Sequence, residues 1–324
     1  MKIAFLILPA AFAGAALNIS AAVAQSYPEK PVRVVVPAVP GGALDVVARQ
    51  LMQKLGESVG WQFIIDNRGG ASGAIAAESV ARATPDGYTL LFASSSVLSI
   101  NPHLGAKTTY DIFRSFSPVI LIGFTPNVLV VHPSVPASSV KELITVAKAQ
   151  PGTLAFASNG AGTLSHLTGA LFMQQAGIDM LHVPYKGAAP AVIDTVAGHV
   201  SVLFAAYPSV SGQVQSGRLK ALAVTSAKRV TAAPKLPTVA EAGLPGFEST
   251  QWWGLYGPAG MPVAVVTRLN RELNAILATA DTIKRLAADG AEPAGGSPAD
   301  LAAFHKTDYD RWEKVVRSAG IKGT

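Results

Sequence analysis

Two glycine-rich segments of the chain combine residues that could hold a negatively charged ligand. The first is Pro37 to Asp45 (PAVPGGALD) and the second is Ala157 to His166 (ASNGAGTLSH), each between a β-branched apolar run and a helical pattern. Such a turn presents backbone N–H groups, and the following helix adds the positive end of its dipole. Glycine lets a ligand approach the backbone closely. One such turn would more simply be a tight strand-to-helix connection, but the pair predicts an anion site.

A carboxylate is the expected guest of these turns. Burying an unpaired carboxylate costs several kcal/mol, so donors must surround it. Each charge-assisted hydrogen bond supplies roughly 1.5 to 3 kcal/mol, and about four to six of them would support micromolar binding without an arginine. The predicted ligand-binding residues are Val39, Pro40, Gly41, Gly42, Ala43, Asp45, Ser94, Ser95, Ser158, Asn159, Gly160, Gly162, Thr163, His166, Tyr185 and Lys186. Any of the serine and threonine hydroxyls among them could instead cap a loop, and Lys186 could be a solvated loop lysine.

Motifs for catalysis are incomplete in this sequence. Gly70 to Ala74 approaches the nucleophile elbow G-x-S-x-G but lacks its closing glycine. Ser138 and Lys141 spell S-x-x-K, yet a serine that opens an amphipathic helix is ordinarily its N-cap. A hydrolase that uses Ser158 or Ser94 with His166 is the alternative in another functional class. A ligand-loaded partner of a membrane sensor is the second alternative.

Metal and cofactor chemistry have no motif to support them. The chain has no cysteine, and its six histidines are widely spread without an H-E-x-x-H pattern. It also lacks a Walker loop and a complete G-x-G-x-x-G, so no nucleotide cofactor is predicted. We therefore predict no metal, no cofactor and no enzymatic activity.

The elements that position these turns repeat one unit of strand, glycine or serine loop, and helix. Strands are expected at 32–36, 63–65 and 89–93, and again at 154–157, 180–183, 200–205 and 219–224. This alternation is typical of α/β layers built on largely parallel sheets. An extended segment at 119–131, interrupted by Pro126, and a second one at 251–257 would cross between two groups of such units. Ser297 and Pro298 open a last helix.

The predicted fold class is therefore α/β, with two lobes joined by two hinge crossings and a ligand cleft between them. We expect residues 25–124 together with 251–324 to form lobe 1, and residues 125–250 to form lobe 2. About 300 residues usually divide into two compact units of this kind.

The N-terminus has the features of a secretory signal peptide. Lys2 is the only charge before Glu29, Ala4 to Leu17 is apolar, and Ala22 to Ala24 offers small residues for cleavage. The apolar stretch is shorter than the roughly 20 residues that a membrane-spanning helix needs. We predict a signal peptide at 1–24 and a periplasmic mature protein.

The charge pattern argues against nucleic acid as a partner. Lys and Arg number 26 against 20 Asp and Glu, a net charge of +6, but these basic residues are scattered without aromatic interleaving. This mild excess could steer anions toward the protein.

Many short stretches, in order, make the chain resemble the Bug family, the substrate-binding proteins of tripartite tricarboxylate transporters. The matching stretches are Tyr27-Pro28, Lys30 to Val32, the glycine turn with Asp45, Asn67-Arg68, Thr84 to Leu91, Asn101-Pro102, Ser117 to Val119, Ala157 to Gly162, His166-Leu167, His182 to Gly187, Ala221 to Ser226, Pro237 to Gly243, Pro245 to Glu248 and Trp253 to Leu255. The resemblance implies a type II periplasmic binding protein fold, a cleft where both turns and ordered water grip a carboxylate, and a membrane permease as partner. The expected ligand is a di- or tricarboxylate, an amino acid or an aromatic acid, bound by a monomer.

The sequence departs from the family pattern at two places. The family's first turn usually continues G-G-G-T-D, whereas this chain has Leu44 before Asp45. Loss of a polar donor there would make a less polar or aromatic acid conceivable. The segment Gly105 to Thr109 also differs, which puts a ligand contact there in doubt. Asp45 and Asp194 match family acids, and we expect them to start helices or brace loops at least as readily as to contact ligand.

Overall fold

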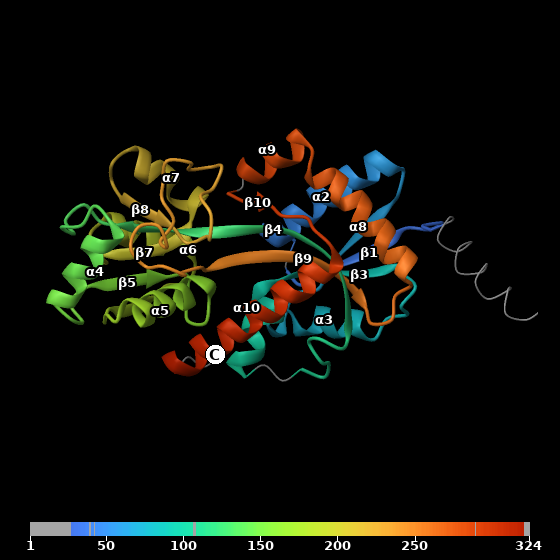
Figure 1. Cartoon of the computed structure of the whole chain (residues 1–324), viewed down its shortest axis with the longest axis horizontal. Coiled ribbons are helices and arrows are strands. Elements are labelled where there is room, and N and C mark those ends of the chain that lie inside the picture. Colours follow the sequence, from blue (N-terminus) through green and yellow to red (C-terminus); the bar gives the residue numbers. More distant parts are fainter. Residues whose placement is uncertain (1–26, 39, 42, 106–107, 289, 321–324) are drawn as a thin grey trace, which may run out of the picture.

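The structure is a computed structural model that describes residues 27–38, 40–41, 43–105, 108–288 and 290–320. The predicted signal peptide, together with Val39 and Gly42, lies outside the described residues. Figure 1 shows two α/β lobes side by side, with long strands and one long helix running between them.

Lobe 1 contains a short parallel sheet covered by helices. Strand β1 (Val32–Val36) lies between β2 (Phe63–Asn67) and β3 (Thr89–Ser94), parallel to both. These strands are rich in Val, Ile and Leu because helices cover the sheet. The helices of this lobe are α2 (Ala43–Val59), α3 (Ala74–Ala81), α8 (Val263–Leu277) and α9 (Ala280–Ala288). Their apolar faces meet the sheet in a core that includes Val34, Leu55, Phe92 and Leu269.

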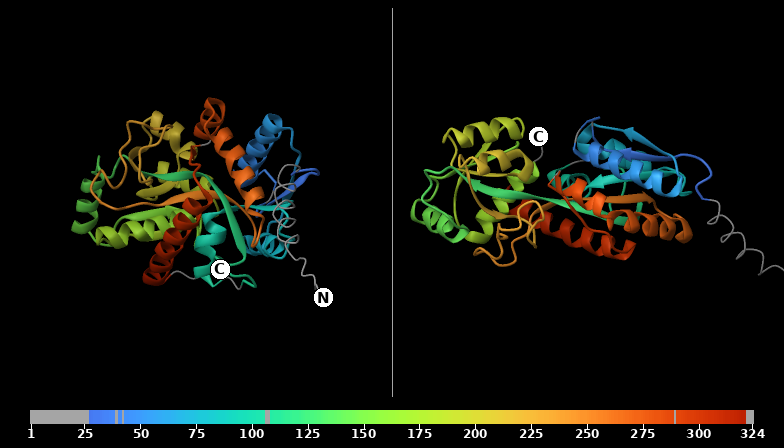
Figure 2. Two further views of the ribbon diagram at one scale, coloured as in Figure 1. Left: turned by 45° about the vertical axis from the view of Figure 1, so that its right-hand side comes forward. Right: turned by 90° about the horizontal axis from the view of Figure 1, so that it is seen from above.

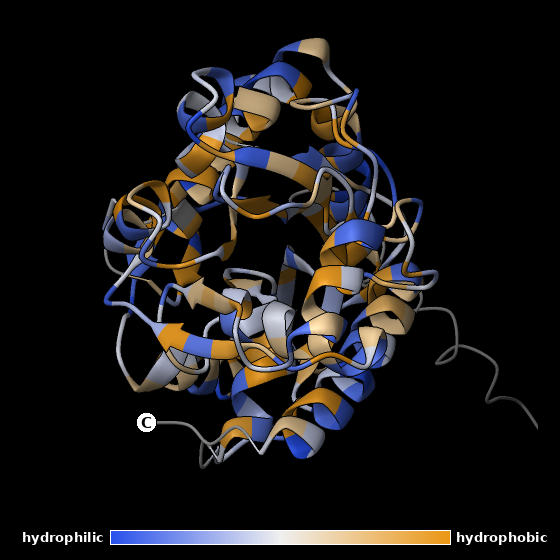
Figure 3. Ribbon diagram, turned by 90° about the vertical axis from the view of Figure 1, so that its left-hand side faces the viewer, coloured by the Kyte–Doolittle hydropathy of each residue, from blue (hydrophilic) through white to orange (hydrophobic). Residues whose placement is uncertain are grey.

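Lobe 2 repeats this arrangement. Strand β5 (Ala155–Ser158) pairs in parallel with β6 (Leu181–Pro184) and β7 (Val202–Ala206), and β8 (Lys220–Val224) completes the lobe. Its helices are α4 (Val140–Ala149), α5 (Leu164–Ala176), α6 (Ala188–Val196) and α7 (Tyr207–Gln215). Phe156, Phe172 and Phe204 are fully buried in its core. The helices carry alternating hydrophobic and hydrophilic stretches, as amphipathic helices do (Figure 3).

Two antiparallel strands connect the lobes. Strand β4 (Phe116–Val131) pairs with β9 (Thr250–Pro258) over its first part. It pairs with β7 over its last five residues and with β8 over its last four. Pro126 does not interrupt β4, as the sequence had suggested; it pairs with Thr250 at the point where β4 exchanges β9 for β7. A proline is tolerated there because the hydrogen-bonding partner changes. The two-residue strand β10 (Glu292–Pro293) also pairs with β4.

The sheets are thus mixed rather than largely parallel. The parallel strands lie within each lobe, and the antiparallel pairs come from the crossing strands and β8. The two predicted crossings are confirmed in the structure, while strand β10 and helix α7 had no recognised sequence signal.

The last helix, α10 (Pro298–Ala319), packs on both lobes. Ser297 is the N-cap expected at its start, and in the structure it forms a capping box with Asp300. Leu301 lies in a core of lobe 1, whereas Trp312 lies in the core of lobe 2. Figure 2 shows α10 lying across both lobes. The lobe boundaries given above stay a prediction.

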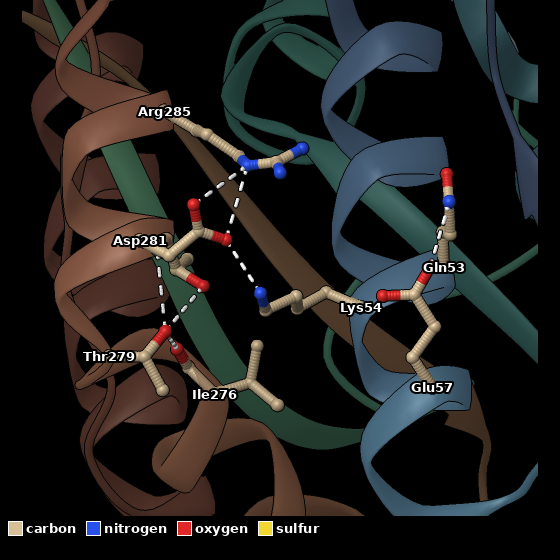
Figure 4. A network of polar contacts seen from close by, with 8 residues as sticks. Gln53, Lys54, Glu57, Ile276, Thr279, Asp281 and Arg285 are labelled. Atoms are coloured by element: carbon tan, nitrogen blue, oxygen red, sulfur yellow. Dashed lines mark hydrogen bonds and ion pairs between the residues drawn. The ribbon is translucent and has the colours of Figure 1, made fainter.

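A polar network ties α9 to α2 at the outer side of lobe 1 (Figure 4). Lys54 Nζ on α2 lies 2.6 Å from Asp281 Oδ2 on α9, and Arg285 Nε lies 3.2 Å from the same carboxylate oxygen. These exposed ion pairs contribute little individually. The Lys54 to Asp281 pair joins two helices that are more than 200 residues apart in sequence, and the Arg285 to Asp281 pair lies within α9.

Candidate functional site

A cleft of about 530 Å³ lies between the two lobes, at the carboxyl ends of β1, β3 and β5. This volume suits a small organic ligand. Serine, threonine and asparagine supply its polar groups, and none of the described residues that line it carries a charge. The lining residues are Pro37, Ser72, Ser94, Ser96, Val97, Asn101, Leu104 and Gly105 from lobe 1 and Ala161, Gly162 and Thr163 from lobe 2. Ser94, Gly162 and Thr163 were among the residues predicted from the sequence.

Three consecutive serines at the end of β3 divide between the cleft and the core. Ser94 and Ser96 line the cleft. Ser95 is fully buried, and its Oγ accepts a hydrogen bond of 3.4 Å from the backbone N–H of Trp252. The structure therefore places Ser95 against the crossing strand β9 rather than in the cleft. Trp252 and Trp253 are both buried, as expected for core or hinge packing.

Ser72 and Asn101 are among the cleft residues of lobe 1 that were not predicted from the sequence. Ser72 has φ 54° and follows Ala71 with φ 45°, a left-handed conformation that is costly for residues with a Cβ. Asn101 Nδ2 donates a 2.7 Å hydrogen bond to the carbonyl oxygen of Ser72. A strained backbone beside a cleft is a known mark of functional sites. The glycine-rich segment 69–73 was the available signal, since such turns favour positive φ.

The first predicted turn is braced by Asp45. This carboxylate is 2 % exposed and accepts hydrogen bonds of 2.8 Å from Gly41 N–H and from Asn67 Nδ2, and Arg49 Nε lies 2.9 Å from it. Burial alone would raise the pKa of Asp45, but these hydrogen bonds outweigh it and hold the pKa below its usual value. Asp45 thus has the bracing role expected for it, and Gly41 N–H is already paired within the turn.

The other residues of the first turn give a mixed result. Pro40 and Gly41 are exposed, and Ala43 begins α2. Val39 and Gly42 lie outside the described residues. Leu44 is buried in the core of lobe 1. Its alkyl side chain packs beneath the turn and supplies no polar contact there, so the effect of Leu44 on ligand choice stays a prediction.

The second predicted turn is held by hydrogen bonds of its own side chains. Asn159 N–H donates to Ser165 Oγ at 2.9 Å, Gly160 N–H to Ser158 Oγ at 3.2 Å, and Thr163 Oγ1 to the carbonyl of Gly160 at 2.6 Å. Thr163 is the N-cap residue of α5 but makes no side-chain capping bond. The first N–H groups of α5 therefore remain for water or a ligand.

His166 and Tyr185 also have partners within lobe 2. His166 Nδ1 accepts a 3.1 Å hydrogen bond from Gly162 N–H. Tyr185 Oη donates to Asp194 Oδ2 at 2.8 Å. Burial, together with this carboxylate, raises the pKa of Tyr185 to about 12. Lys186 is exposed. None of these three side chains lines the cleft.

The geometry gives the hydrolase alternative no support. Ser158 is fully buried, and its Oγ lies 2.7 Å from Nε2 of His182 rather than near His166. Within residues 27–320, apart from the gaps noted above, no hydrogen bond joins His182 to an Asp or Glu side chain. Ser158 also lies 3.1 Å from the carbonyl oxygen of Gly160, so its hydroxyl braces the turn.

Neither a cluster of metal ligands nor a membrane-spanning helix is found in the described part of the chain. There, no three His, Asp or Glu side chains gather as they would around a metal ion. None of the helices in that part combines the length and apolar character needed to cross a membrane.

Comparison with known proteins gives the site its context. The family described as tripartite tricarboxylate transporter family receptor matches residues 47–321. Protein BugT of Bordetella pertussis is 37% identical over 313 residues, which are 96% of this chain and 95% of BugT. The family that matches this chain is a family of solute-binding receptors and not of enzymes.

Two solved structures from Rhodopseudomonas palustris share the fold. One, solved with adipate, is 38% identical with a TM-score of 0.75 and covers 91% of this chain and 99% of its own. The other, MatC with bound malate, is 31% identical with a TM-score of 0.69 and covers 90% and 100%. These matches confirm the predicted type II periplasmic binding protein fold. With its two α/β lobes, uncharged cleft and match over residues 47–321, the chain belongs to the receptor family of tripartite tricarboxylate transporters.

Proposed function

We propose that this protein is exported to the periplasm, binds a small carboxylate in the cleft between its lobes as a monomer, and delivers it to the permease of a tripartite tricarboxylate-type transporter. One observation carries the proposal: this chain, a member of the receptor family, has a cleft that uncharged hydrogen-bonding groups from both lobes line. The adipate and malate found in the two R. palustris structures support a carboxylate as ligand.

An uncharged cleft can hold a carboxylate when enough donors converge on it. The hydroxyls of Ser94, Ser96 and Thr163, the amide of Asn101 and the free N–H groups of α5 provide such donors. Each charge-assisted hydrogen bond contributes roughly 1.5 to 3 kcal/mol, which offsets the cost of removing the carboxylate from water.

Contacts from both lobes connect binding to closure. A ligand that touches Ser94 of lobe 1 and Gly162 of lobe 2 gains its full set of hydrogen bonds only when the lobes approach each other. Such a ligand shifts the population toward the closed form. The permease would then recognise the closed, loaded receptor.

Thermal-shift screening of the purified mature protein tests this function. Adipate, malate, other di- and tricarboxylates, monocarboxylates, aromatic acids and amino acids should be compared, and a bound ligand should raise Tm. Calorimetry of each hit should give one site per chain, without product formation. The absence of any binding carboxylate would contradict the proposal.

A pair of variants links binding to the cleft. Ser96→Ala should weaken binding of the best ligand about tenfold, because it removes one hydrogen bond of about 1.4 kcal/mol. The exposed Ser138 lies outside the cleft, so Ser138→Ala should leave affinity unchanged. Equal affinity of both variants would place the ligand elsewhere.

A further inference from the structure

Two stacked histidines lie directly behind the glycine turn of lobe 2. The ring centroids of His166, in the first turn of α5, and His182, on β6, are 3.8 Å apart with an interplanar angle of 4°. Phe156 on β5 stacks on His182 at 4.8 Å. Three rings from three elements therefore form one stack, and it begins beside the cleft residue Gly162.

Both histidines are hydrogen-bonded to the turn, and one of these bonds fixes a protonation state. A backbone N–H can only donate, so Nδ1 of His166 must be unprotonated to accept from Gly162 N–H at 3.1 Å. His182 Nε2 lies 2.7 Å from Ser158 Oγ, and that oxygen accepts from Gly160 N–H at 3.2 Å. The turn thus depends on His166 directly and on His182 through Ser158.

Among the described residues, the elements that carry the two rings and the strands beside them contain no acidic group that would stabilise a charged ring. Helix α5 and strands β5, β6 and β7 carry no titratable side chain other than these two histidines. In the adjoining loop and on α6, Tyr185 is bonded to Asp194, and Lys186 is exposed. Burial lowers the pKa of His166, and burial together with the neighbouring His166 lowers the pKa of His182 to about 4.

We propose that neutral His166, stacked on His182, is a positioning residue that holds Gly162 and Thr163 in the shape that receives the ligand, so that protonation of His166 weakens carboxylate binding. This inference rests on the proposed function. A proton on Nδ1 would face the N–H of Gly162, and two donors cannot bond each other. The turn would have to move, and with it the lobe 2 wall of the cleft. A second charge on His182, 3.8 Å away, would add repulsion.

The opposite dependence on pH would indicate a different role. If His166 contacted the ligand as a cation, acidification would strengthen binding, because a positive imidazolium attracts a carboxylate. A positioning role predicts weaker binding as pH falls. The sign of the pH profile therefore separates the two roles.

Three proteins test the inference with adipate as the probe: the wild type, His166→Asn and His166→Leu. The Asn side chain places an amide oxygen near the position of Nδ1 and cannot be protonated. We expect His166→Asn to keep wild-type affinity at pH 7.5 within about threefold, whereas His166→Leu should lose about tenfold or more, the loss of one hydrogen bond. Between pH 7.5 and 5, the affinity of the wild type for adipate should fall more steeply than that of His166→Asn. Protonation of adipate itself affects both proteins equally, so the difference between them reports on His166. Parallel profiles, or wild-type affinity that rises on acidification, would overturn the inference.

A readout without ligand keeps the inference testable if adipate does not bind. In ¹⁵N NMR spectra of the ligand-free protein, His166 should be the Nε2–H tautomer at pH 7.5. The amide signal of Gly162 should shift with the same midpoint as the His166 ring, and this shift should vanish in His166→Asn. A protonated Nδ1 at pH 7.5, or a Gly162 amide that ignores the titration, would refute the positioning role even if carboxylates bind. A correct tautomer with no binding of any carboxylate would instead refute the proposed function alone.

Discussion

The indole Nε1 of Trp252 donates a 2.7 Å hydrogen bond to Oδ2 of Asp308, and both side chains are buried. Trp252 lies on the crossing strand β9, and Asp308 lies on α10, the helix that packs on both lobes. Burial raises the pKa of Asp308, although the Trp252 hydrogen bond opposes this shift. This bond therefore joins a hinge strand to the helix that spans the hinge.

Trp252→Phe should lower the free energy of unfolding by about 1 to 3 kcal/mol more than a matched tryptophan replacement, because it leaves the Asp308 oxygen buried without this donor. Trp312→Phe is the matched control: Trp312 is equally buried, and among the described residues its Nε1 has no hydrogen-bond partner. Urea denaturation of both variants measures the difference. Equal losses would mean that the Trp252 to Asp308 bond adds no net stability.

Ser72→Gly should make the protein more stable and a weaker binder. Glycine relieves the left-handed strain at φ 54°, worth about 1 kcal/mol or more, but the variant loses a cleft hydroxyl. Ala71→Gly is the control, since it relieves a similar strain at φ 45° without changing the cleft lining. Both variants should raise Tm, and only Ser72→Gly should weaken binding of the best carboxylate, by about tenfold. Unchanged affinity of Ser72→Gly would remove Ser72 from the site.

Gly73→Ala should disturb the cleft wall as well as the local backbone. Gly73 has φ 89°, and an added Cβ would lie 2.6 Å from Cγ2 of the cleft residue Val97. Gly60 has φ 73° with open space around it, so Gly60→Ala carries the backbone strain alone, about 1 kcal/mol. Thermal unfolding should show a larger loss of stability for Gly73→Ala than for Gly60→Ala. Calorimetry should show reduced ligand affinity for Gly73→Ala alone. A loss of affinity in Gly60→Ala would indicate a global effect instead.

Acidification should destabilise the fold through buried neutral histidines. His305 is 3 % exposed; its Nε2 lies 3.2 Å from the carbonyl of Leu98 and its Nδ1 lies 3.3 Å from Tyr256 Oη. Burial lowers the pKa of His305 to about 4, although the Leu98 bond opposes this. In the unfolded chain this histidine takes up a proton near pH 6.5. Between about pH 6.5 and 4 the folded state therefore binds fewer protons than the unfolded state, and the free energy of unfolding decreases as the pH is lowered.

Comparison of variants isolates the histidine contribution to this pH dependence. Asp308, whose pKa is raised by burial, acts in the opposite sense, so the wild-type slope alone is not sufficient. His305→Asn should show a shallower decline in stability between pH 6.5 and 4 than the wild type. Identical slopes for the two proteins would contradict a buried neutral His305.

The amino-acid sequence by itself determined the local structure and the family. Ser139 caps α4, and Ser297 with Asp300 caps α10, because capping depends on residues only three apart. The strand positions followed from runs of β-branched residues between glycine turns, and two such series predicted two lobes. Ser94, Gly162 and Thr163, predicted as ligand-binding residues from the turns that carry them, line the cleft.

Only the tertiary structure decided which groups face the cleft and which hold it in shape. Pairing of β5 with β6 sets Phe156 opposite His182, and this register brings Ser158 and His182 together across 24 residues. Likewise, Asn101 reaches Ser72, and Trp312 of the last helix enters the core of lobe 2. Hydrogen bonds within a turn or helix depend on neighbours along the chain, but these contacts depend on sheet register and on helix packing between distant segments.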